Sequence, residues 1–167
     1  GYLVIGGDQK AINSLQNDLP QSGDYPFQIP YHGAFHTPLL NSISEESFKK
    51  IPFSYFKKPI FPLIDGRGKI WTEYSTNTRE LYEYTLGTQV ISSYNFSKSI
   101  TVAIKEFCPD RLIVLGPGNT IGGAIGQILI ENSWNNITSK QVFQTSQQDN
   151  PFLVSMSLLD QREIVLK

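Results

Sequence analysis

The feature that most constrains the fold is a short, almost wholly apolar run at residues 111–115 (RLIVL). Turn residues follow it, and Pro109 ends the helical pattern that precedes it at residues 97–107. Short apolar runs bounded by turns are typical of strands that are buried on both faces of a parallel sheet. We therefore expect a buried strand here, with one helix before it and another after a glycine-rich turn.

The same alternation of strand-like and helical patterns extends over most of the chain. An apolar run at residues 3–5 precedes a helical pattern for which Asp8 is the expected N-cap. The further expected elements are an extended segment at residues 25–30, helices at 37–49 and 78–86, and strands at 61–64 and 152–156. This order predicts an α/β fold with a largely parallel sheet. The polar stretch from residue 134 to residue 150 has little periodicity, and we expect a loop there.

Composition indicates a folded chain and excludes two classes of partner. Hydrophobic residues make up 40% of the 167 residues and charged residues 17%, whereas disordered chains combine low hydrophobicity with high net charge. Lys and Arg number 14 against 15 for Asp and Glu, so we expect no nucleic-acid partner. No apolar stretch approaches the ~20 residues that a membrane helix needs, so we expect no membrane partner either.

Cys108 is the only cysteine of the sequence, which excludes an internal disulfide and any multi-cysteine zinc site. Such low cysteine usage is typical of a reducing compartment, and we expect a cytoplasmic location. Cys108 lies between Phe107 and Pro109 with no basic neighbour in sequence. We therefore interpret it as a buried apolar residue and not as a nucleophile.

The sequence contains two histidines, His32 and His36, whose spacing would place both on one face of a helix as possible metal ligands. Gly33 and Pro38 argue against a helix there, and a zinc site would have to recruit carboxylates as its remaining ligands. We therefore expect no metal and no cofactor. From residue type alone, a surface or packed histidine is the simpler interpretation of each.

A glycine-rich segment at residues 116–123 (GPGNTIGG) connects the expected strand to a helix, where backbone N–H groups can face an anion. Its spacing is G-x-G-x-x-x-G and not the G-x-G-x-x-G of dinucleotide sites, and Pro117 removes one N–H donor. Nucleotide binding stays open as an alternative function. The simpler interpretation is a tight turn that needs no ligand.

The sequence contains no G-x-S-x-G nucleophile elbow. A nucleophile and its base must lie within hydrogen-bond reach of each other. A chain with a candidate base and no candidate nucleophile therefore holds at most half of an active site, and spacing alone assigns it no reaction.

The run at residues 33–40 (GAFHTPLL) resembles the general-base motif of malonyl-CoA:acyl carrier protein transacylases and of polyketide synthase acyltransferase domains. Four further segments resemble landmarks of that family in the family's order, at residues 3–7 (LVIGG), 64–68 (IDGRG), 95–99 (NFSKS) and 115–118 (LGPG). The resemblance covers about residues 1–130.

Members of that family are similar to α/β-hydrolases, with a ferredoxin-like subdomain inserted in the larger one. The resemblance therefore implies that residues 1–30 are the second half of the small ferredoxin-like subdomain. Residues 31–133 would be the C-terminal part of the large acyltransferase subdomain. Residues 134–167 extend beyond the usual end of the family as a polar C-terminal extension, to which we assign no role.

The resemblance also implies roles for three residues. His36 would be the base that takes the proton from a serine hydroxyl and later from the phosphopantetheine thiol of an acyl carrier protein. The family orients this histidine by a main-chain carbonyl near the glutamine of its Q-W-T-K-S stretch, and Asn95 occupies that position here. Phe35 resembles the residue found in malonyl-specific members, where a bulky ring would crowd an α-methyl substituent.

The function implied by the resemblance is transfer of a malonyl group from malonyl-CoA to an acyl carrier protein through an acyl-serine, in fatty-acid or polyketide biosynthesis. The sequence begins directly with a strand-like run and no methionine, so we expect a C-terminal portion of the enzyme. It would need the N-terminal part of the same acyltransferase for its nucleophile, and would be inactive alone. The alternative is a non-catalytic carrier-protein or CoA-binding module that lacks the serine.

Overall fold

The computed structural model describes residues 3–118, 120–149 and 151–166 of the chain. Among these described residues about half are helical, and two small two-stranded sheets accompany the helices, so the expected mixture of helices and strands is confirmed. The chain divides into two compact units, one from Leu3 to Tyr94 and the other from Asn95 onward. The domain boundaries expected at residues 30 and 133 stay predictions.

The first unit begins with an irregular segment and a short helix, α1 (Gln9–Asp18). The Asp8 carboxylate accepts a hydrogen bond from the Ala11 N–H at 2.8 Å, which confirms the expected N-cap. The strand expected at residues 3–5 is wrong, because these residues are irregular and Leu3 is 84% exposed. An apolar run becomes a strand only where a second strand hydrogen-bonds to it, and the described residues provide no such partner. Residues 25–30 likewise form no strand and contribute only one isolated bridge, between Ser22 and Tyr25.

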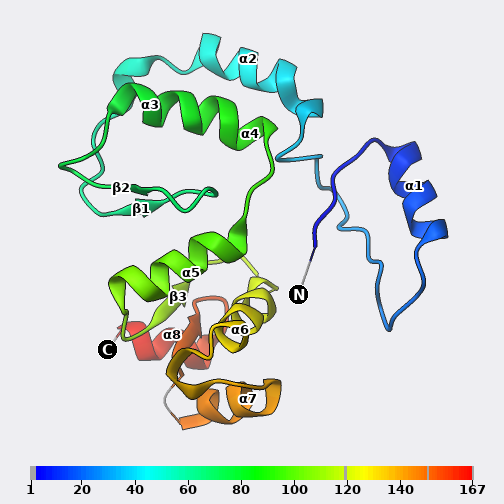
Figure 1. Cartoon of the computed structure of the whole chain (residues 1–167), viewed down its shortest axis with the longest axis vertical. Coiled ribbons are helices and arrows are strands. Elements are labelled where there is room, and N and C mark those ends of the chain that lie inside the picture. The colour runs from blue at the N-terminus through cyan, green and yellow to red at the C-terminus, as the bar shows by residue number, and fades with distance from the viewer. Residues whose placement is uncertain (1–2, 119, 150, 167) are drawn as a thin grey trace. The chain divides into compact units, whose positions relative to one another are not determined.

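Two helical segments pack together in the first unit (Figure 1). A 3-10 turn, η1 (Pro38–Leu40), leads into α2 (Asn41–Lys50), close to the helix expected at residues 37–49. The helix expected at residues 78–86 is longer in the structure. It begins as α3 (Thr78–Glu83), passes through a π-helical turn, η3 (Tyr84–Thr88), and ends as α4 (Gln89–Ile91).

A β-hairpin completes the first unit. β1 (Leu63–Ile64) pairs antiparallel with β2 (Ile70–Trp71), so the strand expected at residues 61–64 is confirmed in its last part. The turn expected at Asp65 and Gly66 joins the two strands, and Gly68 adopts a φ of 78° there, a left-handed conformation that suits glycine. This sheet is antiparallel, which differs from the expectation of a largely parallel one, because the short turn returns the chain directly.

The first unit has an aromatic core. Trp71, Leu81 and Tyr84 form its buried cluster, with Phe56 packed against it. Tyr82 is also buried and meets three phenylalanine rings edge-on at centroid distances of 5.0–5.5 Å, those of Phe48, Phe53 and Phe56. Phe53 belongs to a second 3-10 turn, η2 (Phe53–Tyr55). Edge-to-face contacts of this kind constrain ring orientation as well as burying apolar area.

The second unit combines helices with a parallel strand pair. Its elements in chain order are α5 (Phe96–Phe107), β3 (Leu112–Val114), α6 (Ile121–Glu131), the 3-10 turn η4 (Trp134–Asn136), α7 (Lys140–Asp149), β4 (Leu153–Ser155) and α8 (Leu159–Leu166). β3 pairs with β4 in parallel, with Ile113 opposite Val154, as the apolar run predicts. The expectation that β3 is buried on both faces is wrong, because Ile113 remains 45% exposed.

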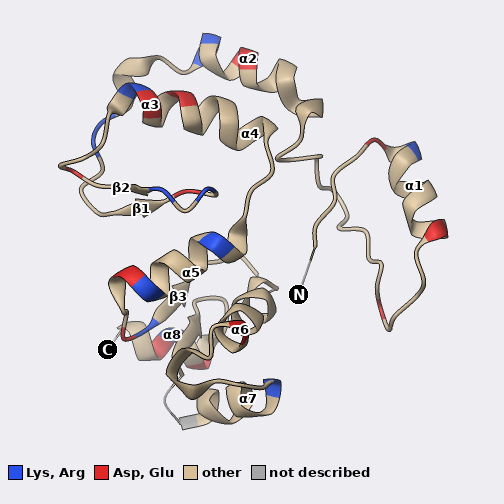
Figure 2. Ribbon diagram, viewed as in Figure 1, with Lys and Arg blue, Asp and Glu red and all other residues tan. Residues whose placement is uncertain are grey.

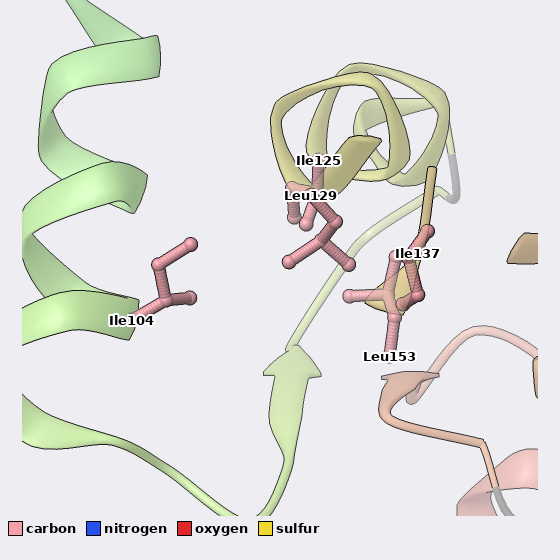
Figure 3. Close-up of a cluster of buried hydrophobic side chains, with 5 residues drawn as sticks. All are labelled: Ile104, Ile125, Leu129, Ile137 and Leu153. Atoms are coloured by element: carbon pink, nitrogen blue, oxygen red, sulfur yellow. The ribbon is translucent and has the colours of Figure 1, made fainter. Parts of the chain in front are cut away.

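An aliphatic core holds the second unit together, and its five buried members point toward one another in Figure 3. They are Ile104, Ile125, Leu129, Ile137 and Leu153. Ile104 and Leu129 have no exposed surface at all. These residues come from α5, α6, β4 and the segment after η4, so the core brings together elements from α5 to β4.

Two further expectations for the second unit are wrong. The loop expected at residues 134–150 contains α7, because Ser139 caps the helix by accepting the Val142 N–H at 3.2 Å and Phe143 packs against the core. Gln147 then bonds to the backbone of Phe152 and Leu153, which ties the polar helix to β4. Cys108, expected to be buried, is exposed. It occupies the left-handed position after α5, beyond the last residue that faces the core.

Charges of both signs are interspersed in each unit, as Figure 2 shows on α2, α3 and α5. Among the described residues, no helix combines the length and the apolar character that crossing a bilayer requires.

Candidate active site at His36

His36 lies two residues before the turn η1 and caps the end of the helix that closes with α4. Its backbone N–H donates to the Val90 carbonyl at 3.0 Å, and its ring Nδ1 lies 2.5 Å from the Gln89 carbonyl oxygen. The last carbonyls of a helix have no partner within the helix, so these two oxygens are available to a residue from elsewhere in the chain. His36 supplies donors to both.

The backbone of His36 is itself unusual. Its φ is 62°, in the left-handed region that few residues other than glycine adopt. Such conformations cost of the order of 1–3 kcal/mol and persist only where the surroundings enforce them, often at functional sites. The two bonds to Gln89 and Val90 provide that enforcement.

The bond to Gln89 defines the chemistry of the imidazole. A carbonyl oxygen can only accept a hydrogen bond, so Nδ1 is the nitrogen that carries the proton. In the neutral ring Nε2 then has the free lone pair. In that neutral form the half-buried side chain can accept a proton at Nε2 while a backbone carbonyl holds Nδ1, the place that a carboxylate takes in a serine-protease triad.

Tyr94 contacts the imidazole of His36. The two ring centroids are 5.3 Å apart and the planes are tilted by 37°. Tyr94 also lies against Gly66 in the hairpin turn, where a Cβ on Gly66 would clash with Tyr94 Cδ2. A single ring thus contacts both the candidate base and the turn.

Asp65 organises that turn. Its carboxylate accepts hydrogen bonds from the backbone N–H groups of Arg67 and Lys69 at 2.8 and 3.0 Å, and from the indole N–H of Trp71 at 3.2 Å. It also forms an ion pair with the Arg67 guanidinium at 2.6 Å. Burial is the largest influence and raises the pKa of Asp65, but the hydrogen bonds and charge of Arg67 and the Lys69 N–H together lower it below its ordinary value. Asp65 is therefore a structural carboxylate that stays ionised.

Tyr84 connects the turn to the helix that ends at His36. Its hydroxyl accepts the Gly66 N–H at 2.9 Å, and the Arg67 guanidinium lies 4.1 Å from the centre of its ring. Burial, the largest cause, raises the pKa of the Tyr84 hydroxyl above its ordinary value. The hydroxyl thus stays protonated and serves as a fixed acceptor for the turn.

A cavity of about 260 Å³ opens beside the hairpin. Its lining residues are Arg67, Lys69, Trp71, Glu80, Glu83, Tyr84 and Thr88. Its cations are already compensated, since Arg67 pairs with Asp65, and Lys69 pairs with Glu80 at 2.9 Å and lies over Trp71. His36 does not line it, so this cavity adds no group to the candidate base.

The structure places the other expected site residues as follows. Phe35 is 57% exposed and its ring meets that of His32 edge-on at 5.6 Å. Asn95 begins the second unit as the N-cap of α5, where its side chain accepts the Lys98 N–H at 2.8 Å. The carbonyl that bonds to His36 belongs to Gln89. The roles assigned to His36, Phe35 and Asn95 stay predictions.

Sequence reasoning missed Gln89 and Tyr94. One signal could have found Gln89, because any residue near the C-terminal end of the helix expected from residue 78 offers a carbonyl without a partner. No local signal marks Tyr94, whose contacts are with residues far away in sequence.

The other motifs considered for function are the possible metal ligands and the glycine-rich segment. In the part of the chain that is described, no three His, Cys, Asp or Glu side chains come together as possible metal ligands. The glycine-rich segment forms the turn between β3 and α6, where the Ser157 hydroxyl donates to the Gly118 carbonyl at 2.9 Å. Asn119 of that segment lies outside the described residues.

Comparison with known proteins gives one significant similarity. The chain is 26% identical over 137 residues to the highly reducing polyketide synthase ausV of Aspergillus calidoustus. The match covers 75% of this chain and 5% of that synthase, so the chain corresponds to a small part of its length. No family model and no solved structure matches. The chain is thus similar to a segment of a polyketide synthase.

Proposed function

We propose that this chain is part of an acyltransferase and that His36 is its general base. The substrate would be malonyl-CoA, and the acceptor would be the phosphopantetheine thiol of an acyl carrier protein. The observation that carries the proposal is the bond from His36 Nδ1 to the Gln89 carbonyl at 2.5 Å, which leaves Nε2 free to take a proton. The similarity to a polyketide synthase supports it, because polyketide synthesis requires acyl groups loaded on carriers.

The first half of the reaction acylates a serine. Nε2 of His36 takes the proton of the serine hydroxyl while the serine oxygen attacks the thioester carbonyl of malonyl-CoA. The C–S bond then breaks, and the imidazolium returns the proton to the departing CoA thiolate. The serine belongs to a segment that this sequence does not contain.

The second half regenerates the serine. The same nitrogen takes the proton of the carrier's thiol, whose sulfur attacks the acyl-serine ester. The C–O bond breaks and His36 returns the proton to the serine oxygen. The net products are malonyl-carrier and free CoA. Phe35, adjacent to the base, would disfavour an α-methyl group on the acyl chain, a discrimination of about 1–3 kcal/mol.

We also propose an architecture for the complete enzyme. The chain would contribute to an α/β-hydrolase-like subdomain and, through its first thirty or so residues, to a ferredoxin-like one. An N-terminal part of the same acyltransferase would be its partner. The parallel pair β3–β4 with a helix following each strand is the kind of unit from which such a sheet is built.

The test uses the full reading frame that encodes this chain, assayed for malonyl transfer from malonyl-CoA to an acyl carrier protein. His36→Asn is the informative variant, because asparagine tolerates the left-handed backbone but cannot act as the base. Transfer should fall by about a hundredfold or more, the low end for loss of general-base catalysis. His32→Ala is the matched control and should retain activity, since His32 has no hydrogen bond to the helix end.

Two results would contradict the proposal. Full activity of a folded His36→Asn enzyme would show that His36 is not the general base. A folded full-length protein that binds CoA or carrier without transferring an acyl group would identify a binding module that lacks the catalytic function.

A further inference from the structure

We propose that Tyr94 is a positioning residue for the imidazole of His36 and that Gly66 holds Tyr94 in place. The inference rests on the proposed role of His36 as a general base. It assigns a purpose to the turn at residues 65–68, which lies outside the histidine motif.

The bond to Gln89 does not by itself fix the base. It holds Nδ1, but a hydrogen bond weakens steeply only when its angle falls below about 120°, so the imidazole can still turn to some extent about its Cβ–Cγ bond, and that turn moves Nε2. Catalytic groups need to be held within about 0.5 Å and 10–20° of their productive geometry. The ring of Tyr94, 5.3 Å from the imidazole centroid, restricts the rotation that the hydrogen bond leaves free.

Gly66 determines where the Tyr94 ring can lie. A Cβ at position 66 would clash with Cδ2 of Tyr94 and would lie only 2.8 Å from Cε2 and Cγ of the same residue, far inside contact distance. The φ of Gly66 is outside the left-handed range, so its backbone does not itself require glycine. The close approach of the ring is therefore the reason for glycine at this position.

The turn is anchored to the same helix that orients His36. Gly66 donates its N–H to the Tyr84 hydroxyl at 2.9 Å, and Tyr84 begins the π-helical turn that ends directly before Gln89. Both restraints on the imidazole thus refer to one helical segment, through Gln89 on one route and through Tyr84, Gly66 and Tyr94 on the other. Because both restraints are attached to the same helical segment, a shift of that segment moves the two together.

The test measures the state of the imidazole directly. Nitrogen-15 NMR of the neutral His36 side chain in the 167-residue chain reports which ring nitrogen carries the proton and whether the ring has one environment. The wild-type chain should show protonated Nδ1. Tyr94→Leu should give mixed protonation of the two nitrogens, and Tyr94→Phe should restore the wild-type spectrum because it keeps the ring.

Gly66→Ala provides an independent arm. It should disturb the His36 signals in the wild-type background but leave them as in Tyr94→Ala when added to that variant, because alanine lacks the Cγ and ring atoms that the new Cβ would displace. Gly7→Ala is the matched control, since its Cβ would meet Ala11 at an ordinary 3.5 Å. In the complete acyltransferase, Tyr94→Leu should lower kcat about 10- to 100-fold with KM unchanged, as misplacement of a catalytic group does.

The outcomes separate this inference from the proposed function. Wild-type His36 spectra in both Tyr94→Leu and Gly66→Ala would overturn the inference even if the enzyme transfers malonyl groups. Disturbed spectra with rescue by Tyr94→Phe would establish the positioning role, even in a protein that proves not to be a transferase.

Discussion

The two units of the chain are stabilised by different chemistry. The unit from Leu3 to Tyr94 has an aromatic core, and a buried carboxylate, Asp65, is hydrogen-bonded at its edge. The unit from Asn95 onward has a core of isoleucine and leucine. Aliphatic packing depends on volume and area and is largely indifferent to direction, whereas hydrogen bonds and ring contacts also fix orientation.

That difference corresponds to where the candidate base is found. His36 lies in the unit whose contacts are directional, and each of its supports is a hydrogen bond or a ring contact. Catalytic side chains must be held in a defined orientation, which aliphatic packing does not provide by itself. The comparison predicts that mutations in the aliphatic unit change stability, whereas mutations near the turn at Asp65 also change the state of His36.

Leu129→Ala should have the largest effect on stability. Leu129 is fully buried at the centre of the aliphatic core, and large-to-small changes at such positions cost about 2–5 kcal/mol. Hydrogen exchange followed by mass spectrometry should show faster exchange in α5, α6 and β4. Exchange in α3 and the nitrogen signals of His36 should stay at wild-type values. Equal loss of protection in α3 would mean that the two cores unfold together, and it would contradict the view that the two units are stabilised separately.

Asp65→Asn should come next, with a loss of about 2–3 kcal/mol. The carboxylate accepts two backbone N–H groups and the Trp71 indole, and hydrogen bonds to a charged group contribute about 1.5–3 kcal/mol. Denaturant unfolding followed by the fluorescence of Trp71, in a Trp134→Phe background, measures this. Asp24→Asn is the control, since Asp24 is exposed. An unchanged denaturant midpoint for Asp65→Asn would show that the charge of the carboxylate does not stabilise the fold.

The same residue predicts an acid dependence. The pKa of Asp65 is lower in the folded chain than in the unfolded one, where it is about 3.9. Its contribution to stability is therefore fully present above that value and is lost as the pH falls through the lower, folded pKa. The stability difference between wild type and Asp65→Asn should be constant near neutral pH and shrink below about pH 4. If this stability difference grew on acidification, the pKa of Asp65 would be raised and not lowered by folding, which would contradict the prediction.

Local signals predicted much of the secondary structure. Asp8 marks the start of α1, Pro38 lies in the first turn before α2, and Pro109 follows the end of α5, because each acts through its own backbone neighbours. The sequence did not predict the helix α7, because polar residues dominate its pattern and Phe143 is, of its described residues, the one that packs against the core.

The candidate site was only partly predictable for a related reason. The motif around His36 predicted the candidate base, but Gln89 and Tyr94 are brought to it by tertiary structure and have no signature of their own. Glycine at position 66 looked like ordinary turn chemistry, and the ring that requires it is invisible until the chain folds.

Asn95→Ala should have the smallest effect, about 1 kcal/mol, which is the usual cost of losing an N-cap. The Asn95 side chain accepts the Lys98 N–H, and its carbonyl accepts the Ser99 N–H at 3.1 Å, so both groups serve the first turn of α5. Asn95→Asp keeps a capping oxygen and should restore the thermal midpoint. Because the role assigned to this position belongs to the backbone, both variants of the complete enzyme should retain kcat wherever they remain folded. A kcat that falls in both variants while the cap is intact in one would place the Asn95 side chain in the chemistry, and the directional contacts that support the reaction would then extend into the second unit.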